Sequence, residues 1–189
     1  HKLCGPTGIG FLWARENILE DMPPLFGGGE MIQDVFEEKS TWADLPHKFE
    51  AGTPAIAEAI GLAEALKYIN KLGLKNIHRY EQELTKYLFE KMRVIRNLNI
   101  IGPHPNQDPN RASLATFYIK NIHANDIAEI LDSKGICIRS GHHCCQPLHR
   151  YIGINSTARV SMNFTTTKND IDIFIEKLKE TINFLDINS

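Results

Sequence analysis

A reactive thiol is the chemical feature that this sequence suggests most strongly. Cys144 stands in the run RSGHHCCQP, which covers residues 139–147. A cysteine becomes nucleophilic as its thiolate, and cationic or hydrogen-bond-donating neighbours lower the pKa of the thiol. Several such neighbours lie within a few residues, namely Arg139, His142, His143 and His149. Residues 135–139 read as a short buried strand, so residues 141–147 are expected to form a loop that presents the thiol from a rigid element.

Three other interpretations of this segment were weighed. Zinc ligands usually occur as C-x2-4-C or H-x3-5-H, whereas four adjacent donors cannot easily face one ion, so we expect no metal site. A redox pair of Cys144 and Cys145 is disfavoured, because a vicinal disulfide is strained and C-x-x-C spacing is absent. A polar loop that contains a thiol by chance remains open.

A lysine beside a glycine-rich turn is the second chemical feature. Lys2 precedes the segment GPTGIG at residues 5–10 and the apolar run at residues 9–14, which reads as a strand entered through a tight turn. A lysine near a terminus is most often a surface residue. With these neighbours, however, it is similar to the Schiff-base lysine of enzymes that use pyridoxal 5'-phosphate (PLP), where burial favours the neutral amine.

Five segments in a fixed order carry a family resemblance that covers nearly the whole chain. They are HKLCGPTGIG (residues 1–10), GGGEMI (27–32), FEAGTP (49–54), RSGHHC (139–144) and ARVS (158–161). Together they resemble the SUF-type cysteine desulfurases and the related selenocysteine lyases, within the fold-type I PLP enzymes. The chain resembles the C-terminal portion of such an enzyme. The missing upstream half would supply much of the cofactor pocket, and we therefore expect the isolated chain to be inactive.

The resemblance implies a role for six residues. Lys2 would form the Schiff base with PLP, while His1 and, from a neighbouring subunit, Thr53 would help to hold the cofactor phosphate. Cys144 would take sulfur from L-cysteine as a persulfide, with release of alanine. Arg159 would bind the substrate carboxylate through its guanidinium fork, and Arg139 would assist. Cys145 departs from the family pattern, in which alanine is usual beside the nucleophile.

The resemblance also implies an α/β fold with two parts. Residues 1–72 would be the end of the large PLP-binding domain, with an interface hairpin within residues 27–54 and a linking helix. Residues 73–189 would form a compact C-terminal α/β domain. Periodicity places helices at 55–72, 76–92, 124–133 and 168–186, and strands at 98–101, 113–119, 136–139 and 158–163. Thr167 with Asp170 is predicted to cap the last helix.

Composition and charge agree with a globular enzyme. Hydrophobic residues make up 42% of the chain and charged residues 23%, which are ordinary globular values. A net charge of −2 and the lack of a long apolar run give no case for nucleic acid or a membrane as partner. Four cysteines are too few for a disulfide scaffold and fit a reducing compartment, the cytoplasm or an organelle such as a plastid.

The prediction is a homodimeric PLP-dependent cysteine desulfurase that passes persulfide sulfur to an acceptor protein for iron-sulfur cluster assembly. The alternative enzyme is a selenocysteine lyase, which needs the same lysine and carboxylate clamp. The alternative of another class is a non-catalytic dimerisation or interaction fragment.

Overall fold

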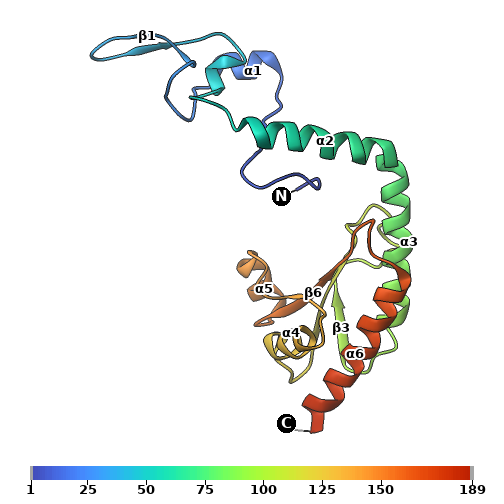
Figure 1. Cartoon of the computed structure of the whole chain (residues 1–189). Coiled ribbons are helices and arrows are strands. Elements are labelled where there is room, and N and C mark those ends of the chain that lie inside the picture. Colours follow the sequence, from blue (N-terminus) through green and yellow to red (C-terminus); the bar gives the residue numbers. More distant parts are fainter. Residues whose placement is uncertain (1, 188–189) are drawn as a thin grey trace. The chain divides into compact units, whose positions relative to one another are not determined.

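A computed structural model describes residues 2–187 of the chain, which form two compact units. The first unit extends to Gly73 and the second begins at Leu74, as the colours along the chain in Figure 1 allow the reader to follow. The sequence predicts the domain boundary after residue 72, one residue before the boundary between these units. No helix among the described residues combines the length and the apolar character that crossing a bilayer requires.

The first unit consists of short elements followed by one long helix. Its elements are α1 (Glu16–Asp21), the antiparallel pair β1 (Ile32–Val35) and β2 (Ser40–Trp42), the 3-10 turn η1 (His47–Phe49) and α2 (Ile56–Leu72). The predicted helix at 55–72 is thus confirmed to within one residue. It ends at Gly73, whose φ of 84° suits a residue without a side chain and whose N–H donates to the carbonyl of Ile69.

This first unit has almost no core of its own. Among its described residues only Met31 and Ile69 are buried apolar side chains. The strand predicted at residues 9–14 is wrong: the segment forms no regular element and pairs with no strand among the described residues, and its Trp13 is 82% exposed. A strand needs a neighbour to satisfy its backbone groups, and the described residues offer none to this segment. Apolar residues of α2 are likewise uncovered, since Ile56 is 59% and Ile60 63% exposed.

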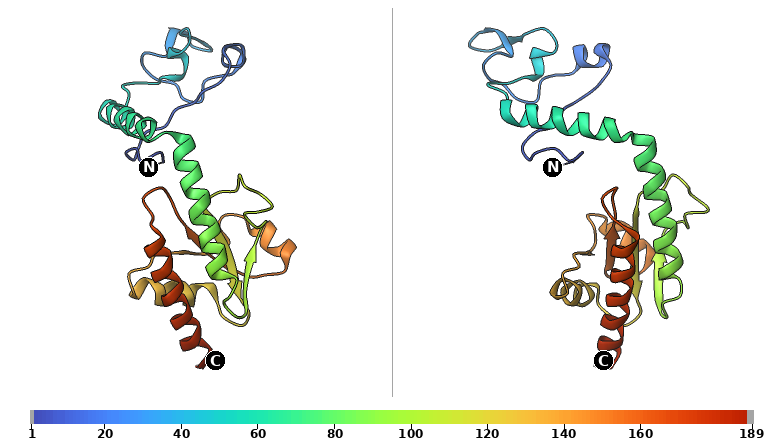
Figure 2. Two further views of the ribbon diagram at one scale, coloured as in Figure 1. Left: turned by 90° about the vertical axis from the view of Figure 1, so that its right-hand side faces the viewer. Right: turned by 45° about the vertical axis from the view of Figure 1, so that its right-hand side comes forward.

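The second unit is built around a four-stranded antiparallel sheet. Its elements are α3 (Leu74–Met92), β3 (Leu98–Ile101), β4 (Leu114–Ile119), α4 (Ala124–Ser133), β5 (Arg139–Gly141), α5 (Gln146–Ile152), β6 (Thr157–Ser161) and α6 (Lys168–Ile187). The strand order is β3-β4-β6-β5. Helices α3 and α6 run beside one another, as both views in Figure 2 show for this unit, and Tyr87 of α3 donates to the carboxylate of Asp172 in α6.

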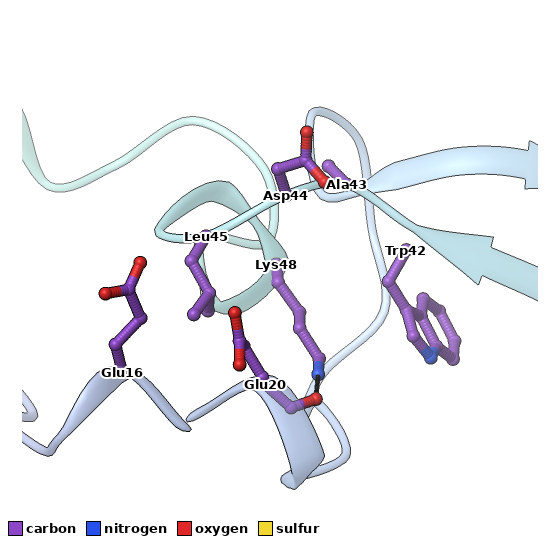
Figure 3. Close-up of a pocket in the computed structure, with 7 residues that line it drawn as sticks. All are labelled: Glu16, Glu20, Trp42, Ala43, Asp44, Leu45 and Lys48. Carbon is purple, nitrogen blue, oxygen red and sulfur yellow. Dashed lines mark hydrogen bonds between the residues drawn. The ribbon is translucent and has the colours of Figure 1, made fainter. Parts of the chain in front are cut away.

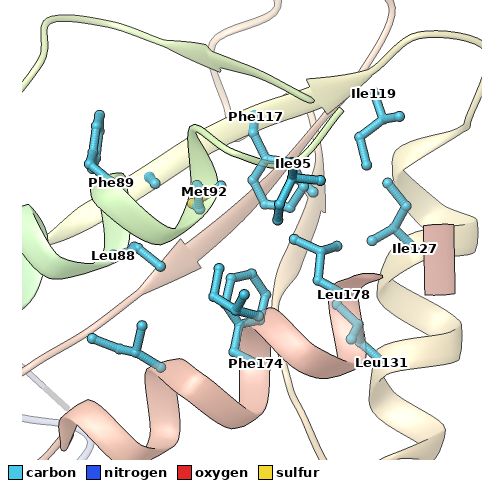
Figure 4. Packing of buried hydrophobic residues seen from close by; sticks show 14 of the residues in the cluster. Leu88, Phe89, Met92, Ile95, Phe117, Ile119, Ile127, Leu131, Phe174 and Leu178 are labelled. Carbon is cyan, nitrogen blue, oxygen red and sulfur yellow. The ribbon is translucent and has the colours of Figure 1, made fainter. Parts of the chain in front are cut away.

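Alternation along the strands gives the sheet two chemically different faces. Ala115, Phe117 and Ile119 of β4 are buried, and they join a hydrophobic cluster supplied by α3, α4, α6 and β6 (Figure 4). Phe117 is fully buried within this cluster. The intervening residues of the strands point to the opposite face, where α5 and the loop before it lie. The second unit therefore has a complete core on one side and a partly covered sheet on the other.

The capping of α6 agrees with the sequence. Asp170 donates its backbone N–H to Oγ1 of Thr167 at 3.2 Å, and the backbone N–H and hydroxyl of Thr167 both donate to the Asp170 carboxylate at 2.8 Å. These bonds favour the ionised carboxylate and hold the pKa of Asp170 below its ordinary value. The reciprocal pair begins the helix at the residue that the sequence predicts.

Two predictions about the thiol segment need correction. The strand expected at 136–139 is instead β5 (Arg139–Gly141), because residues 134–136 form the turn that closes α4, with Ile136 N–H donating to the Leu131 carbonyl. The loop expected to continue through residue 147 ends at Cys145, because α5 starts at Gln146. Proline is compatible with the first turn of a helix, and Gly153 ends α5 with a φ of 79°. The sequence analysis assigned these residues to a loop and did not predict this helix.

Candidate functional site

The predicted nucleophile and a predicted substrate-binding arginine meet in the second unit. Nη2 of Arg139 lies 3.4 Å from Sγ of Cys144, which is exposed. Cys144 occupies the short connection between β5 and α5. Its φ is 63° and that of His143 is 53°, both in the left-handed region that residues with a side chain rarely adopt. Strained backbone of this kind is concentrated at functional sites.

The two predicted arginines lie side by side on the sheet. Arg139 of β5 and Arg159 of β6 are directly opposite one another, and Thr116 of β4 is opposite Arg159 on its other side. Directly paired residues of antiparallel strands share a face, so both guanidinium groups stand on the partly covered face. Like charges in this arrangement repel each other. An anion bound between them would remove that repulsion.

The guanidinium of Arg159 has a hydrogen-bond donor to spare. Its Nε is buried and has no partner among the described residues. Leaving such a donor unpaired typically costs about 1–3 kcal/mol, so native structures retain few of them. Arg159 can therefore donate a hydrogen bond to a polar group that the described residues do not supply.

A cavity of about 330 Å³ adjoins these groups on the same face. Its floor is the sheet, through Thr116, Thr157 and Arg159, and its opposite wall is α5 with the Cys145 turn. The remaining lining is mainly aliphatic, from Ile101, Leu114, Leu148, Ile152 and Ile154. The cavity thus combines one cation with apolar walls.

His149 connects α5 to the sheet beneath it. The side chain is only 4% exposed, and its Nε2 lies 3.0 Å from Oγ1 of the fully buried Thr157. Its Nδ1 lies 3.2 Å from the carbonyl oxygen of Cys145. Thr157 in turn donates to the carbonyl of Gly141 at 3.5 Å, a long contact. These contacts attach both ends of the Cys144 turn to β6, two residues from Arg159.

His143 is held as a neutral imidazole. Burial is the largest cause that lowers its pKa, followed by the positive charges of Arg159 and Arg139 and by His149. The Thr157 backbone acts weakly in the opposite direction. Both ring nitrogens are buried, and neither has a partner with normal hydrogen-bond geometry within the described residues. A neutral imidazole carries one N–H, so His143 also brings an unpaired donor to the cavity.

The predicted cofactor residues belong to the first unit. Lys2 is exposed and starts a tight turn in which the N–H of Gly5 donates to its carbonyl at 2.9 Å. A Cβ at Gly5 would come within 2.8 Å of Leu62 Cδ1 in α2, so glycine lets this turn pack against α2 without a shift of Leu62. Thr53 is exposed and follows Gly52, which has a φ of 77°. His1 lies outside the described residues.

Sequence reasoning missed the roles of three residues around the cavity. His143 and His149 were noted only as bases near Cys144, and Thr157 was not considered. The density of histidine in residues 142–149 is the signal that could have suggested a buried network. Burial of His149 depends on α5, which the sequence reading did not contain.

A different cavity, of about 390 Å³, lies in the first unit. Figure 3 shows its lining of Glu16, Glu20, Trp42, Ala43, Asp44, Leu45 and Lys48. The ammonium of Lys48 donates to the carbonyl oxygens of Leu19 and Glu20 at the end of α1, so it is engaged in holding two segments together. This cavity contains none of the predicted site residues. Within residues 2–187, no three His, Cys, Asp or Glu side chains gather in a way that would hold a metal ion.

Comparison with known proteins assigns a family to this arrangement. The aminotransferase class-V family matches residues 1–174, which is most of the chain. The chain belongs to this family, and the α/β fold expected from the sequence is confirmed.

Individual relatives make the similarity more specific. The chain is 54% identical over 184 residues to a probable cysteine desulfurase of Synechocystis sp., an alignment that covers 97% of the chain and 44% of that protein. Its structure is similar to that of the cysteine desulfurase CsdA of Escherichia coli in an S-sulfonic acid form. The TM-score is 0.88 at 30% identity, over 97% of this chain and 45% of that one.

A more distant likeness, with 19% identity and a TM-score of 0.75, is to C-DES, solved with glycine covalently linked to its PLP cofactor. It covers 94% of this chain and 43% of that one and shows a shared fold. The chain thus spans less than half the length of the relatives that it matches.

Proposed function

We propose that the protein to which this chain belongs is a PLP-dependent cysteine desulfurase. The observation that carries the proposal is the contact of Arg139 with Cys144 beside Arg159. This contact places the Cys144 thiol close to the two arginines, which together can bind a small anion. Relatives named as cysteine desulfurases support it. The reaction would convert L-cysteine and the Cys144 thiol into L-alanine and a Cys144 persulfide.

The residues present fit PLP by the chemistry of their donors. Lys2 is an exposed amine on a turn that glycine packs against α2, and an amine is the group that binds an aldehyde. Thr53 offers a hydroxyl at a glycine turn for the phosphate, a role that the resemblance also gives to His1. When bound, the cofactor acts as an electron sink for chemistry at the substrate α-carbon.

Cys144 is the residue that we assign to sulfur abstraction. Arg139 is the only charged group that the structure places in hydrogen-bond contact with its sulfur among the described residues. A guanidinium stabilises a thiolate at this position, and the thiolate is the form that attacks sulfur. Because the turn is exposed, a substrate can approach it and an acceptor can later remove the sulfur.

Arg159 is the residue that we assign to the substrate carboxylate. Its unpaired Nε and the repulsion from Arg139 are both relieved when a carboxylate binds. A guanidinium can offer two parallel N–H donors to the two oxygens, which orients the amino acid as well as holding it. Neutral His143 adds no competing positive charge at this point.

The partners are proposals of the same kind. We propose a homodimer, because the first unit leaves large apolar side chains such as Phe26 and Trp42 exposed and Thr53 is expected to act across subunits. A sulfur-acceptor protein would receive the persulfide at the exposed Cys144 turn for iron-sulfur cluster assembly. The reducing compartment suggested by the cysteine content is part of this proposal.

The test is the reaction of the full-length protein, loaded with PLP, with L-cysteine. We expect alanine to form together with a sulfur atom attached at Cys144, and we expect Cys144→Ser to form neither. Turnover of selenocysteine by Cys144→Ser, without turnover of cysteine, would indicate that the Cys144 thiol is required to remove sulfur but not to remove selenium. Undiminished alanine formation by Cys144→Ser would refute the assignment of the nucleophile.

A further inference from the structure

Cys145 has surroundings different from those of Cys144. Its side chain is half-buried and lines the 330 Å³ cavity, whereas Cys144 is exposed. The Cys145 thiol donates to the carbonyl oxygen of His142 at 2.9 Å, and its sulfur lies 3.8 Å from Nδ1 of His149. The chain therefore holds two adjacent thiols, one facing the outside and one facing a cavity with a base beside it.

Nδ1 of His149 is placed to receive the proton of this thiol. With the proton on Nε2, the ring donates to Thr157 Oγ1 and presents an unprotonated Nδ1 toward Cys145. After it takes up a proton, Nδ1 can donate to the Cys145 carbonyl oxygen at 3.2 Å. The imidazolium is thus hydrogen-bonded at both nitrogens, and the neutral ring offers an unprotonated Nδ1 within reach of the thiol, as general-base action requires.

The cavity has an unpaired donor and room for an added atom. Both ring nitrogens of His143 are buried and have no hydrogen-bond partner in the described part of the chain, and His143 lines the same cavity as Cys145. A persulfide on Cys145 would add one sulfur atom, which needs little of the 330 Å³ available. The aliphatic side chains of Leu148 and Ile152 line the cavity beside that sulfur.

We propose that Cys145 is a second sulfur-carrying residue, which accepts the sulfane sulfur from Cys144 and stores it in the cavity. This inference rests on the proposed function, because the first sulfur must come from desulfuration at Cys144. The Cα atoms of adjacent residues are only about 3.8 Å apart, so a change of side-chain rotamer is enough to bring a persulfide on one thiol to the other.

The transfer is balanced without any further reactant. His149 Nδ1 takes the proton of the Cys145 thiol, and the resulting thiolate attacks the outer sulfur of the Cys144 persulfide. A new sulfur–sulfur bond forms at Cys145 while the bond at Cys144 breaks. The electron pair of the broken bond stays on Cys144 Sγ, where Arg139 Nη2 at 3.4 Å stabilises the thiolate. The sulfane sulfur keeps its oxidation state, and Cys144 is ready for a second substrate.

The number of alanine molecules formed in the first burst tests this proposal. Full-length PLP-loaded protein is mixed with excess L-cysteine in the absence of reductant and acceptor, and alanine is counted per chain. We expect a burst of about two for the unchanged protein and about one for Cys145→Ser, because the second sulfur then has no place. Cys137→Ser is the matched control, since Cys137 is an exposed cysteine of the same unit outside the cavity, and it should keep a burst of two.

Mass spectrometry identifies the position of the sulfur in the same samples. After alkylation, fragmentation between residues 144 and 145 should place added sulfur on both cysteines of the unchanged protein. Equal bursts of alanine in the unchanged protein and in Cys145→Ser would overturn the proposal. Two alanines per chain in both proteins would mean that the second sulfur extends the sulfur chain on Cys144, and one in both would mean that Cys145 accepts no sulfur. Absence of any alanine from the unchanged protein would instead refute the proposed desulfurase function, so the two failures are distinguishable.

Discussion

Replacement of Arg159 by lysine separates charge from geometry at the proposed substrate site. Arg159→Lys keeps one positive charge on β6 opposite Arg139, so the long-range electrostatics change little. It removes the planar fork and the buried Nε, which has no partner among residues 2–187. If a substrate carboxylate uses two of these donors, the lysine retains one of the two bonds.

The size of the effect follows from the loss of that one bond. A hydrogen bond between charged groups typically contributes about 1.5–3 kcal/mol. Since about 1.4 kcal/mol corresponds to a factor of ten, Arg159→Lys should weaken substrate binding by roughly tenfold to somewhat more than a hundredfold. The change should occur in KM and in kcat/KM for cysteine, because the carboxylate contact exists before any bond is broken.

The assay is steady-state alanine formation by the full-length protein over a range of cysteine concentrations. Arg93→Lys is the matched control, because Arg93 is an exposed residue of the same unit outside the cavity, and it should leave both constants as they are. Unchanged KM and kcat in Arg159→Lys would remove Arg159 from the substrate site and would refute the reasoning from its unpaired Nε.

Three further predictions concern pH, the core and the isolated chain. Because the pKa of His143 is lowered from its ordinary value of 6.5, its neutral form stabilises the fold above that pH, and this contribution is lost as the pH falls. Lowering the pH from 7.5 to 5.5 should therefore reduce the free energy of unfolding less in His143→Gln than in the unchanged protein, as measured by urea denaturation. An equal reduction in both proteins would contradict the burial of His143. Phe117→Ala should lower the free energy of unfolding by about 3–5 kcal/mol in the same assay, because Phe117 is fully buried. A loss below about 1 kcal/mol would show that Phe117 lies outside the core. The isolated chain should form little alanine even with added PLP. Its first unit has only two buried apolar side chains among the described residues to support a cofactor pocket. Steady formation of alanine by the isolated chain would disprove this prediction.

Local patterns of the sequence were enough to predict the long helices and their ends. Apolar residues at helical spacing predicted α2, α3, α4 and α6 to within about two residues. Gly73 after α2 and the Thr167–Asp170 pair before α6 act through bonds that span only a few residues. Such signals survive in sequence because both partners lie within one turn of chain.

Strand positions depended more on surroundings that the sequence does not display. Residues 136–138 have the composition of a strand, but the turn that closes α4 uses part of this segment, and β5 begins later. Residues 9–14 have a similar composition and pair with nothing among the described residues. Whether an apolar run becomes a strand is decided by the presence of a neighbour with free backbone groups.

The chemistry of the site was divided in the same way between sequence and tertiary structure. The sequence by itself determined which groups are available: a thiol among bases at Cys144, an amine beside a glycine turn at Lys2, and two arginines. Only the antiparallel register placed Arg139 opposite Arg159, although twenty positions of sequence separate them. Only the packing of α5 buried His149 and gave Cys145 a cavity, because burial results from contacts between segments and not from the residues of one segment.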